Sequence, residues 1–261
     1  MLKRYGQHFL SDPAILNGIV DALSPTAADT VVEIGPGRGS LTEILAGRAG
    51  RLVAVEIDKL LADHLRTRYA SRPSVEIVEG DVLEADLNAL AGDDFLLIGN
   101  VPYYITTPII FKALEPPIPR RSVFLVQREV AERMAADADT ESYGALTVNL
   151  AVVAKVEIVA GVPARAFKPP PKVDSSVIRL TPLADPLVPL ESLRAFRTFI
   201  QAVFGQRRKQ LQRVLRTVAG LSAEDSAAIL ERVGIDQAAR PEVVSPKDFA
   251  RLFGELRALK N

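Results

Sequence analysis

Short apolar runs alternate with amphipathic stretches over the N-terminal two-thirds of the chain. The runs lie at 30–34, 52–58, 75–78, 96–98, 122–127 and 177–180. Most of them are apolar at consecutive positions, which is typical of strands that are buried on both faces, as in parallel sheets. Segments in which apolar residues recur at helical spacing separate them. This alternation predicts an α/β fold built on an open, mainly parallel sheet.

Several helices are predicted from capping residues and apolar periodicity. Asp12 and Pro13 are expected to open a helix that stops at Ser24, and further helices are expected at 106–114 and 128–136. Residues 146–153 and 154–159 are interpreted as additional strand material, and 177–180 as the strand that closes the sheet. The proline-rich segment 167–175 is expected to be a rigid, extended loop.

The C-terminal part of the chain shows helical periodicity alone. We expect four short helices there, at 190–204, 206–218, 222–233 and 246–259. The last two begin with capping pairs, Ser222 with Asp225 and Ser245 with Asp248. The intervening segment 181–188 is interpreted as a linker. The sequence therefore predicts an α/β domain at 1–182 and a small all-helical domain at 188–261.

Composition narrows the class of protein. The chain has 261 residues, of which 48% are hydrophobic, enough for a sizeable core. It has no cysteine and only two histidines, so disulfides and thiolate metal sites are excluded and a histidine-rich metal centre is not expected. No apolar run approaches the ~20 residues of a membrane span, and the first residues lack the long apolar segment of a signal peptide. We therefore expect a cytoplasmic protein.

Charge is balanced over the whole chain but not along it. The 32 basic residues equal the 32 acidic ones, yet from Pro189 onward there are 13 basic and 8 acidic residues. No acidic residue occurs from Gln206 to Thr217, a stretch that contains Arg207, Arg208, Lys209, Arg213 and Arg216. Such a stretch favours contact with the phosphates of a nucleic acid. An ordinary solvated helix face is the alternative.

Polar and glycine residues follow four of the predicted strands directly. Gly35, Gly37 and Gly39 come after the first strand, and Ser40 with Glu43 is expected to form a capping box that opens the next helix. Glu56, Asp81 and Asn100 end or follow the next three strands. The carboxyl ends of parallel strands meet at one edge of an open sheet, where ligands bind. We therefore expect these residues to form one site.

The spacing of these residues constrains the ligand. Glu56 lies 21 positions after Gly35, where βαβ folds place a carboxylate on ribose hydroxyls, whereas Asp58 is better explained as a helix cap. The glycines follow G-x-G-x-G spacing rather than the G-x-G-x-x-G of dinucleotide sites. On spacing alone, a nicotinamide cofactor remains possible.

The stretch Asn100 to Tyr104 ends the strand in an amide, a proline and two phenols. Pro102 fixes its own φ and holds Val101 extended, so an amide oxygen and a neighbouring carbonyl can accept both hydrogens of an exocyclic amine. Tyr103 can stack on the base that carries this amine. Phe167 could be the second face of a base sandwich or plain packing. A loop-forming turn is the alternative for the tetrapeptide itself.

Taken together, these residues resemble the rRNA adenine N6,N6-dimethyltransferases. The matching pieces run through the whole chain and are Gly6 to Leu10, Glu33 to Gly37, Glu56 with Asp58, Gly80-Asp81, Asn100 to Tyr103, Pro170 to Ser175 and Phe204 to Lys209. Two positions depart from the family pattern: Val101 replaces the usual Leu, and His8 stands where many members have Asn. Since the chemistry uses the backbone carbonyl of residue 101 and not its side chain, the replacement of Leu by Val101 is expected to matter little.

The resemblance implies a function and its residues. It implies a Rossmann-like, S-adenosylmethionine-dependent enzyme that dimethylates the N6 amines of two adjacent adenosines in the 3′-terminal hairpin of 16S rRNA during ribosome biogenesis. The cofactor would be bound by His8, Leu10, Gly35, Glu56, Asp81 and Asn100. The catalytic group would be Asn100, Val101, Pro102, Tyr103 and, by analogy, Phe167. The RNA contacts would come from Arg207, Arg208, Lys209 and Arg213. The partner would be the immature 30S subunit, and a monomer is expected.

Three alternatives remain at this level. A related enzyme could methylate large-subunit rRNA, although the basic motif from Phe204 to Lys209 favours the small subunit. A non-catalytic assembly factor could keep the same fold, although the intact tetrapeptide at Asn100 argues for catalysis. A dehydrogenase is the third, and both the glycine spacing and the basic C-terminal part argue against it.

Overall fold

The computed structural model describes residues 8–259, in which the chain divides into two compact units. The first comprises residues up to Ala131 together with Glu157–Pro182, and the second comprises Glu132–Val156 and residues from Leu183 onward. The predicted division into domains at 1–182 and 188–261 stays a prediction. The structure adds that Glu132–Val156 groups with the C-terminal helices, which the sequence pattern does not reveal.

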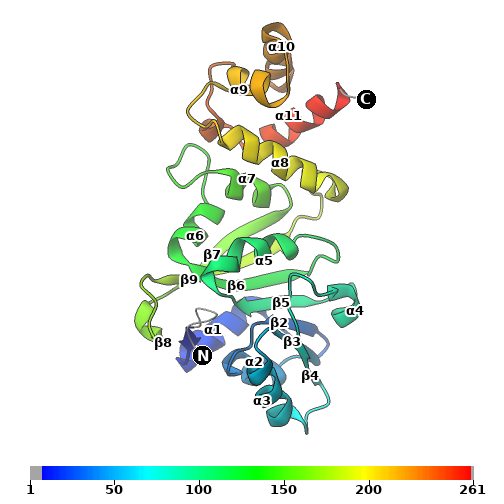
Figure 1. Cartoon of the computed structure of the whole chain (residues 1–261), viewed down its shortest axis with the longest axis vertical. Helices are drawn as coiled ribbons and strands as arrows, with labels where there is room; N and C mark the ends of the chain where they lie inside the picture. The colour runs from blue at the N-terminus through cyan, green and yellow to red at the C-terminus, as the bar shows by residue number, and fades with distance from the viewer. Residues whose placement is uncertain (1–7, 260–261) are drawn as a thin grey trace. The chain divides into compact units, whose positions relative to one another are not determined.

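A seven-stranded sheet lies at the centre of the α/β part of the described chain (Figure 1). Its strand order is β4-β3-β2-β5-β6-β9-β7. The bounds are β2 Thr30–Ile34, β3 Arg51–Glu56, β4 Val75–Glu79, β5 Leu96–Asn100, β6 Arg121–Gln127, β7 Ala154–Val162 and β9 Ser175–Pro182. The strands from β4 to β6 pair in parallel, and β9 pairs antiparallel with β6. The predicted mainly parallel sheet is therefore confirmed.

The order in which successive strands are added to the sheet reverses between the parallel neighbours β2 and β5. From β2 the chain proceeds outward through β3 to β4, and from β5 it proceeds through β6 in the other direction, although β2 and β5 are hydrogen-bonded neighbours. The crevice at such a reversal, outside the carboxyl ends of the strands, is the usual ligand site of an open α/β sheet. Gly35 and Asn100 lie on its two sides, directly after β2 and at the end of β5.

Six helices connect the strands in the described part of this region. They are α1 Pro13–Leu23, α2 Ser40–Ala46, α3 Lys59–Tyr69, α4 Leu87–Ala91, α5 Thr106–Lys112 and α6 Arg128–Met134. As predicted, Asp12 caps α1: its carboxylate accepts from the backbone N–H groups of Ala14 and Ile15. The apolar face of α1 is buried with strand residues such as Val31, Ile98 and Val123 in one core.

A short two-stranded sheet joins distant parts of the first unit. The strand β1, Phe9–Leu10, pairs antiparallel with β8, Phe167–Lys168. Leu10 lies opposite Phe167, and both side chains are buried in the core. This pairing holds the segment from His8 to Leu10 in place next to the seven-stranded sheet. Gly6 and Gln7 of the predicted motif lie outside the described residues.

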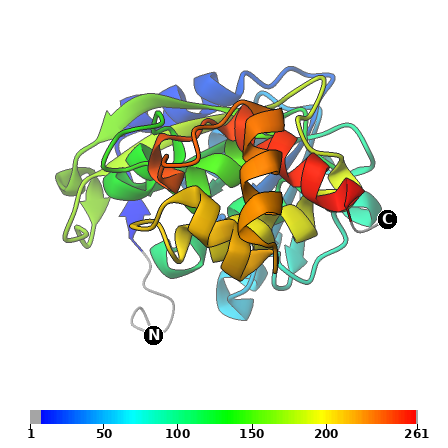
Figure 2. The same ribbon diagram turned by 90° about the horizontal axis from the view of Figure 1, so that it is seen from above.

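The second unit is helical. Its helices are α7 Ala145–Ala151, α8 Leu193–Phe204, α9 Leu211–Val218, α10 Ala223–Val233 and α11 Pro246–Ala258, of which the last four run from yellow to red in Figures 1 and 2. Ser222 and Ser245 cap α10 and α11, as predicted. Phe204 packs against both Tyr143 and Phe249, with ring centroids 6.0 and 5.7 Å away.

Three predicted elements are wrong in type or extent. Residues 146–153, interpreted as strand, are mostly the helix α7; its residues 146–150 are all buried, so no polar face marks the helical period. The segment 177–180 does not close the sheet, because β9 lies between β6 and β7. The helix predicted from residue 206 begins only at Leu211, and Arg207, Arg208 and Lys209 lie in the turn before it.

Within residues 8–259, no helix is long and apolar enough to cross a membrane. The structure also shows no group of three or more His, Asp or Glu side chains in this range that could hold a metal ion.

Candidate active site at the carboxyl end of the sheet

A cavity opens where β2, β3, β4 and β5 end. All the sequence-predicted cofactor-binding residues line it, together with the predicted tetrapeptide. These are His8, Leu10, Gly35, Glu56, Asp81, Asn100, Val101, Pro102 and Tyr103. Sheet register explains the convergence: Ile34 lies opposite both Val55 and Gly99, so the residues that follow β2, β3 and β5 come together at one edge.

The loop after β2 brings bare backbone to the cavity. Gly35, Gly37 and Gly39 have φ values of +65°, +59° and +84°, a region that side chains with a Cβ rarely adopt. The predicted capping box of Ser40 and Glu43 is wrong. Gly39 is the N-cap residue and makes no side-chain hydrogen bond, Ser40 is already helical, and the Glu43 carboxylate pairs with Arg68 instead.

Phe9 covers this glycine loop. A Cβ on Gly37 would lie 3.1 Å from the Phe9 ring, and the Arg38 guanidinium lies 4.5 Å from the centroid of the same ring. The β1 strand therefore packs directly against the loop, and a side chain at residue 37 would displace it. Glycine is required here both for its φ and for this close approach.

Glu56 ends β3 with a buried carboxylate that accepts hydrogen bonds from the backbone. Its Oε2 accepts from the N–H of Gly37 and its Oε1 from the N–H of Asp58, each at 2.9 Å. Burial raises the pKa of Glu56, and the hydrogen bonds from Asp58 and Gly37 oppose this shift. Because each carboxylate oxygen has two lone pairs, each can accept one further hydrogen bond from a ligand.

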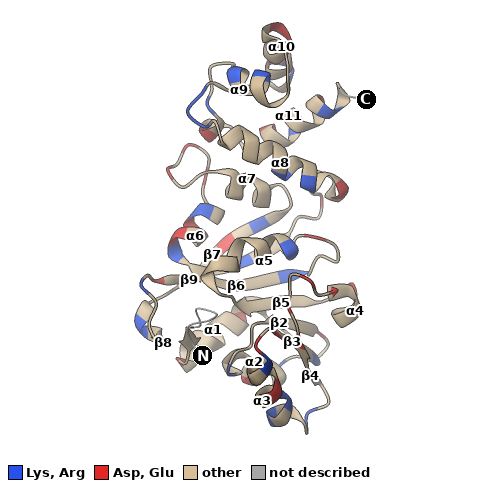
Figure 3. Cartoon of the chain, in the orientation of Figure 1, with Lys and Arg blue, Asp and Glu red and all other residues tan. Residues whose placement is uncertain are grey.

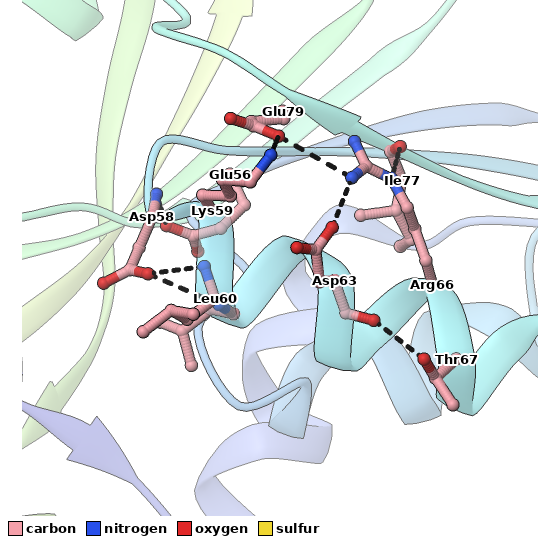
Figure 4. A network of polar contacts seen from close by, with 10 residues as sticks. Glu56, Asp58, Lys59, Leu60, Asp63, Arg66, Thr67, Ile77 and Glu79 are labelled. Carbon is pink, nitrogen blue, oxygen red and sulfur yellow. Dashed lines mark hydrogen bonds and ion pairs between the residues drawn. The ribbon is translucent and has the colours of Figure 1, made fainter.

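The helix behind Glu56 is held by a polar network (Figure 4). Asp58 caps α3 by accepting from the N–H of Leu60, the capping role that the sequence favoured for it. Farther along the helix, Arg66 pairs with Asp63 at 2.8 Å and with Glu79 at 3.7 Å. These exposed pairs each contribute little. The pair of Arg66 with Glu79 connects α3 to the end of β4, next to the loop that carries Asp81.

Asp81 follows β4 and is half-buried at the cavity wall. Its Oδ1 accepts from the N–H of Leu83 at 2.9 Å, which fixes the side chain in a turn. The backbone of this turn is tied to β3 by the Gly80 N–H, which donates to the Glu56 carbonyl at 3.0 Å. Asp81 thus remains an acceptor toward the cavity, next to the Glu56 strand end.

Asn100 is held by the segment that precedes β1. Its amide nitrogen donates to the backbone carbonyl of His8 at 3.4 Å. This contact identifies the donor end of the amide and leaves Oδ1 as an acceptor. On the other side, a Cβ added to Gly35 would lie 3.8 Å from the Asn100 carbonyl. Val101 is buried and Pro102 is partly exposed, so the tetrapeptide is anchored in the core behind the cavity.

Tyr103 is the aromatic residue of the tetrapeptide, and two contacts orient its ring. The phenol lies 2.7 Å from the hydroxyl of Ser175, which is buried at the start of β9. The His8 ring stacks on it, with centroids 5.9 Å apart and planes 24° apart, while His8 Nδ1 donates to the Pro169 carbonyl at 2.8 Å. Burial raises the pKa of Tyr103. The tyrosine is therefore a neutral, fixed ring on the cavity wall.

Comparison with known proteins decides the family. A family model described as ribosomal RNA adenine dimethylase matches residues 1–258. The chain belongs to this family. It is 41% identical to "Ribosomal RNA small subunit methyltransferase A" of Caldanaerobacter subterraneus, over 98% of this chain and 97% of that one. It is 42% identical to the protein of the same name from Acidobacterium capsulatum, over 97% and 90%.

Solved structures of related proteins share the fold. A dimethyladenosine transferase from Plasmodium falciparum superposes with a TM-score of 0.81 at 27% identity, covering 96% of this chain and 98% of that one. The 23S rRNA methyltransferase ErmE gives 0.75 at 31% identity, covering 95% and 99%. The predicted resemblance to rRNA adenine dimethyltransferases and the predicted α/β methyltransferase fold with C-terminal helices are thereby confirmed.

Phe167 is the one predicted catalytic residue of this family member that the structure does not bring to the cavity. Its side chain is only 2% exposed and packs in the core, since the residue lies in β8 opposite Leu10.

The four predicted RNA-binding residues lie in the second unit and are all exposed. Figure 3 shows the basic turn between α8 and α9 in blue. Within it, Arg207 pairs with Glu242 at 3.3 Å.

Glu33 belongs to the family motif, but the sequence analysis assigned it no role. It lies in β2, is 1% exposed and lines the cavity. Its carboxyl accepts from the Thr42 hydroxyl at 2.7 Å. Burial raises the pKa of Glu33 to about 8, the neighbouring Glu56 charge adds to the rise, and the Thr42 hydrogen bond opposes it. The signal available in the sequence was an acidic residue within a run of apolar residues that predicts a buried strand.

Two exposed apolar side chains at the cavity also went unassigned. Ile57, directly after Glu56, is 47% exposed, and Tyr104, directly after the tetrapeptide, is 66% exposed. Both line the cavity. Partial exposure of a lining residue places it at the mouth rather than the floor.

Proposed function

We propose that the protein transfers methyl groups from S-adenosylmethionine to the N6 amines of two adjacent adenosines in the 3′-terminal hairpin of small-subunit rRNA. The observation that carries this proposal is the position of Asn100: it lies at the reversal point of the sheet, with its amide nitrogen engaged by the His8 carbonyl. The names of the relatives support the small-subunit target.

The cavity suits S-adenosylmethionine. The Glu56 carboxylate has two oxygens with two lone pairs each, so beside its backbone hydrogen bonds it can accept from two adjacent ribose hydroxyls. Asp81 would accept from the adenine amine. The positive-φ glycines from Gly35 to Gly39 allow the amino-acid portion to lie against the backbone. His8 and Leu10 would close the site from the N-terminal side. When bound, this cofactor supplies an electrophilic sulfonium methyl group.

The tetrapeptide prepares the target amine. The lone pair of adenine N6 is delocalised into the ring, which makes the amine a poor nucleophile. Asn100 Oδ1 and the Val101 carbonyl would accept hydrogen bonds from the two N–H groups of this amine. These bonds would favour a tetrahedral nitrogen with a localised lone pair. Pro102 restricts the backbone so that this carbonyl keeps its direction. In-line attack then requires positioning more than acid–base catalysis.

Tyr103 would hold the target base. An adenine must leave its base stack before N6 can reach the cavity. The Tyr103 ring, fixed by His8 and Ser175, offers a flat face on which the base can stack. Phe167 was the expected second face, and its burial in the core lends no support to that role.

The second unit would bind the rRNA backbone. Arg207, Arg208, Lys209 and Arg213 are exposed and positively charged, and no acidic residue occurs from 206 to 217. Phosphate contacts of this kind supply affinity and positioning without reading the base sequence. We propose the immature 30S subunit as the particle to which they bind. A cytoplasmic location and a monomeric state stay predictions.

Methylation of large-subunit rRNA is the second candidate. One observation favours it: the 23S rRNA methyltransferase ErmE is 31% identical and superposes over 95% of this chain. The relatives named for the small subunit are more similar, at 41% and 42% identity. We therefore place the small-subunit target first.

One experiment separates these candidates. The purified protein is incubated with labelled S-adenosylmethionine and either unmethylated small subunits or large subunits, and modified nucleosides are mapped by mass spectrometry. We expect N6,N6-dimethyladenosine at two adjacent positions of the 3′-terminal hairpin. Modification of large-subunit rRNA would keep the chemistry and overturn the target. Cofactor binding without transfer to either particle would favour a non-catalytic assembly factor.

A further inference from the structure

Tyr104 is the only exposed phenylalanine or tyrosine among residues 8–259. Its side chain is 66% exposed, whereas every other such ring in this range is buried or half-buried. The residue also lines the cavity, so its ring lies at the mouth. Among the described residues, the Tyr104 side chain makes no hydrogen bond and no ring contact with another aromatic residue. Single exposed apolar side chains are normal on a protein surface, but this one lies at the mouth of the candidate active site.

The local backbone explains why this ring is exposed. Tyr103, Tyr104 and Ile105 form one turn of 3₁₀ helix, closed by the Ile105 N–H, which donates to the Pro102 carbonyl at 3.1 Å. With three residues per turn, successive side chains point about 120° apart. Because Ser175 and His8 fix the direction of Tyr103, Tyr104 must point elsewhere. The turn therefore presents two rings, one on the cavity wall and one at its mouth.

We propose that Tyr104 stacks on the nucleobase next to the adenosine that enters the site. This inference rests on the proposed function. When a base leaves its stack, its neighbour loses a stacking face, which contributes to the cost of extrusion. The neighbouring nucleotide is covalently joined to the target adenosine, so its base stays close to the site that Tyr103 lines. The exposed ring of Tyr104, one residue from Tyr103, is therefore placed to cover that face. With two adjacent targets, the covered neighbour is the second adenosine or the nucleotide flanking the pair.

A simpler alternative is that Tyr104 covers the bound cofactor, since it lines the same cavity. The two roles differ in what they affect. Stacking on RNA changes the concentration of ribosomal particle needed for half-maximal transfer and leaves cofactor affinity unchanged. Covering the cofactor changes the dissociation constant of S-adenosylmethionine in the absence of RNA.

The test compares Tyr104→Ala, Tyr104→Phe and the control Ile158→Ala. Ile158 is an exposed apolar residue in the edge strand β7, 45% exposed and outside the cavity lining. For each protein, single-turnover methylation is measured against the concentration of unmethylated small subunits, and cofactor binding is measured by titration calorimetry. We expect Tyr104→Ala to raise the half-maximal particle concentration by about 5- to 100-fold, the range that corresponds to loss of one base–aromatic stack.

Tyr104→Phe is expected to stay within about 2-fold of wild type, because stacking uses the ring face and not the hydroxyl. Unchanged particle dependence in Tyr104→Ala would overturn the inference while active wild-type and Ile158→Ala proteins keep the proposed function. Weaker cofactor binding in Tyr104→Ala, with unchanged particle dependence, would likewise overturn it in favour of the cofactor role. No transfer by the wild-type protein to small subunits would overturn both proposals.

Discussion

The phenol of Tyr103 and the hydroxyl of Ser175 lie 2.7 Å apart, although 72 residues separate them in the chain. Ser175 is positioned independently of the tyrosine. It pairs with Gln127 in the sheet, and the preceding Asp174 accepts from the backbone N–H of Ala164 at 3.0 Å. The bond therefore ties the tetrapeptide to a rigid strand.

Breaking this bond is expected to destabilise the fold by a measurable amount. Tyr103→Phe leaves the Ser175 hydroxyl buried without this partner, so the free energy of unfolding should fall by about 1–2 kcal/mol. Ser175→Ala should cost a similar amount, and the double variant less than the sum of the two. Urea unfolding of the four proteins provides the measurement. Strictly additive losses would show that the two hydroxyls do not interact in solution.

Asn100→Ala is expected to lower the single-turnover rate of methyl transfer by ~10²-fold or more, since removal of one transition-state hydrogen-bonding group often has this effect. Asn88→Ala, in the exposed position 88 of α4, is the matched control and should transfer at the wild-type rate. A near-normal rate for Asn100→Ala would remove Asn100 from the catalytic role.

Glu56→Ala should weaken the binding of S-adenosylmethionine by roughly 1–3 kcal/mol, because it removes the acceptor for the ribose hydroxyls. Isothermal titration calorimetry in the absence of RNA measures this directly. Glu84→Ala, at an exposed position outside the cavity lining, is the control and should bind normally. Equal affinities of wild type and Glu56→Ala would refute the assignment.

Glu33 makes stability depend on pH. Its pKa is about 8 in the folded protein against 4.5 for the free side chain, so the folded state binds the extra proton between these values. The stability associated with the neutral carboxyl is full below the unfolded pKa and is lost as the pH rises through the folded one. Relative to Glu33→Gln, the wild type should lose on the order of 1–5 kcal/mol between about pH 5 and about pH 9.

Urea unfolding across this pH range tests the Glu33 prediction. Glu33→Gln is the informative variant because its amide oxygen can still accept from the Thr42 hydroxyl and its shape is the same. Parallel pH profiles for the two proteins would show that Glu33 titrates normally.

Arg208→Ala should weaken binding to small-subunit rRNA and reduce the slope of log affinity against log salt by about 1, since one phosphate contact is lost. Arg208 is exposed in the turn between α8 and α9. Arg251→Ala is the control, because Arg251 pairs with Asp248 in α11, and this substitution should leave the slope unchanged. Filter binding over a range of salt concentrations provides the measurement; an unaltered slope in Arg208→Ala would exclude a phosphate contact at this residue.

The sheet and most of the cavity lining could be predicted from local signals. Apolar runs that end in glycine or in a carboxylate marked the carboxyl ends of β2, β3 and β4, and parallel pairing then brings Gly35, Glu56 and Asp81 to one edge. The helix α7 was missed because burial on all sides removes the amphipathic period, and β-branched residues such as Val148 favour strands when read alone.

The remaining features depend on contacts between distant residues or on a local turn without a clear sequence signal. The burial of Phe167 follows from its pairing with Leu10 in a two-residue strand, too short for any sequence pattern to predict. The raised pKa of Glu33 requires the packing around β2 and the position of Thr42, neither of which residue spacing specifies. The exposure of Tyr104 depends on a single 3₁₀ turn, which has no clear sequence signal beside a proline.

His8 contacts three parts of the first unit: the Asn100 amide through its carbonyl, the Tyr103 ring by stacking, and the Pro169 carbonyl through Nδ1. The last of these partners lies 161 residues downstream. During synthesis on the ribosome, the segment that begins the described chain must therefore wait until residues beyond Pro169 have emerged before its contacts are complete. A truncated nascent chain should contain the glycine loop and the Asn100 strand, yet His8, which lines the cavity, can make its bond to Pro169 only when the proline-rich segment is available.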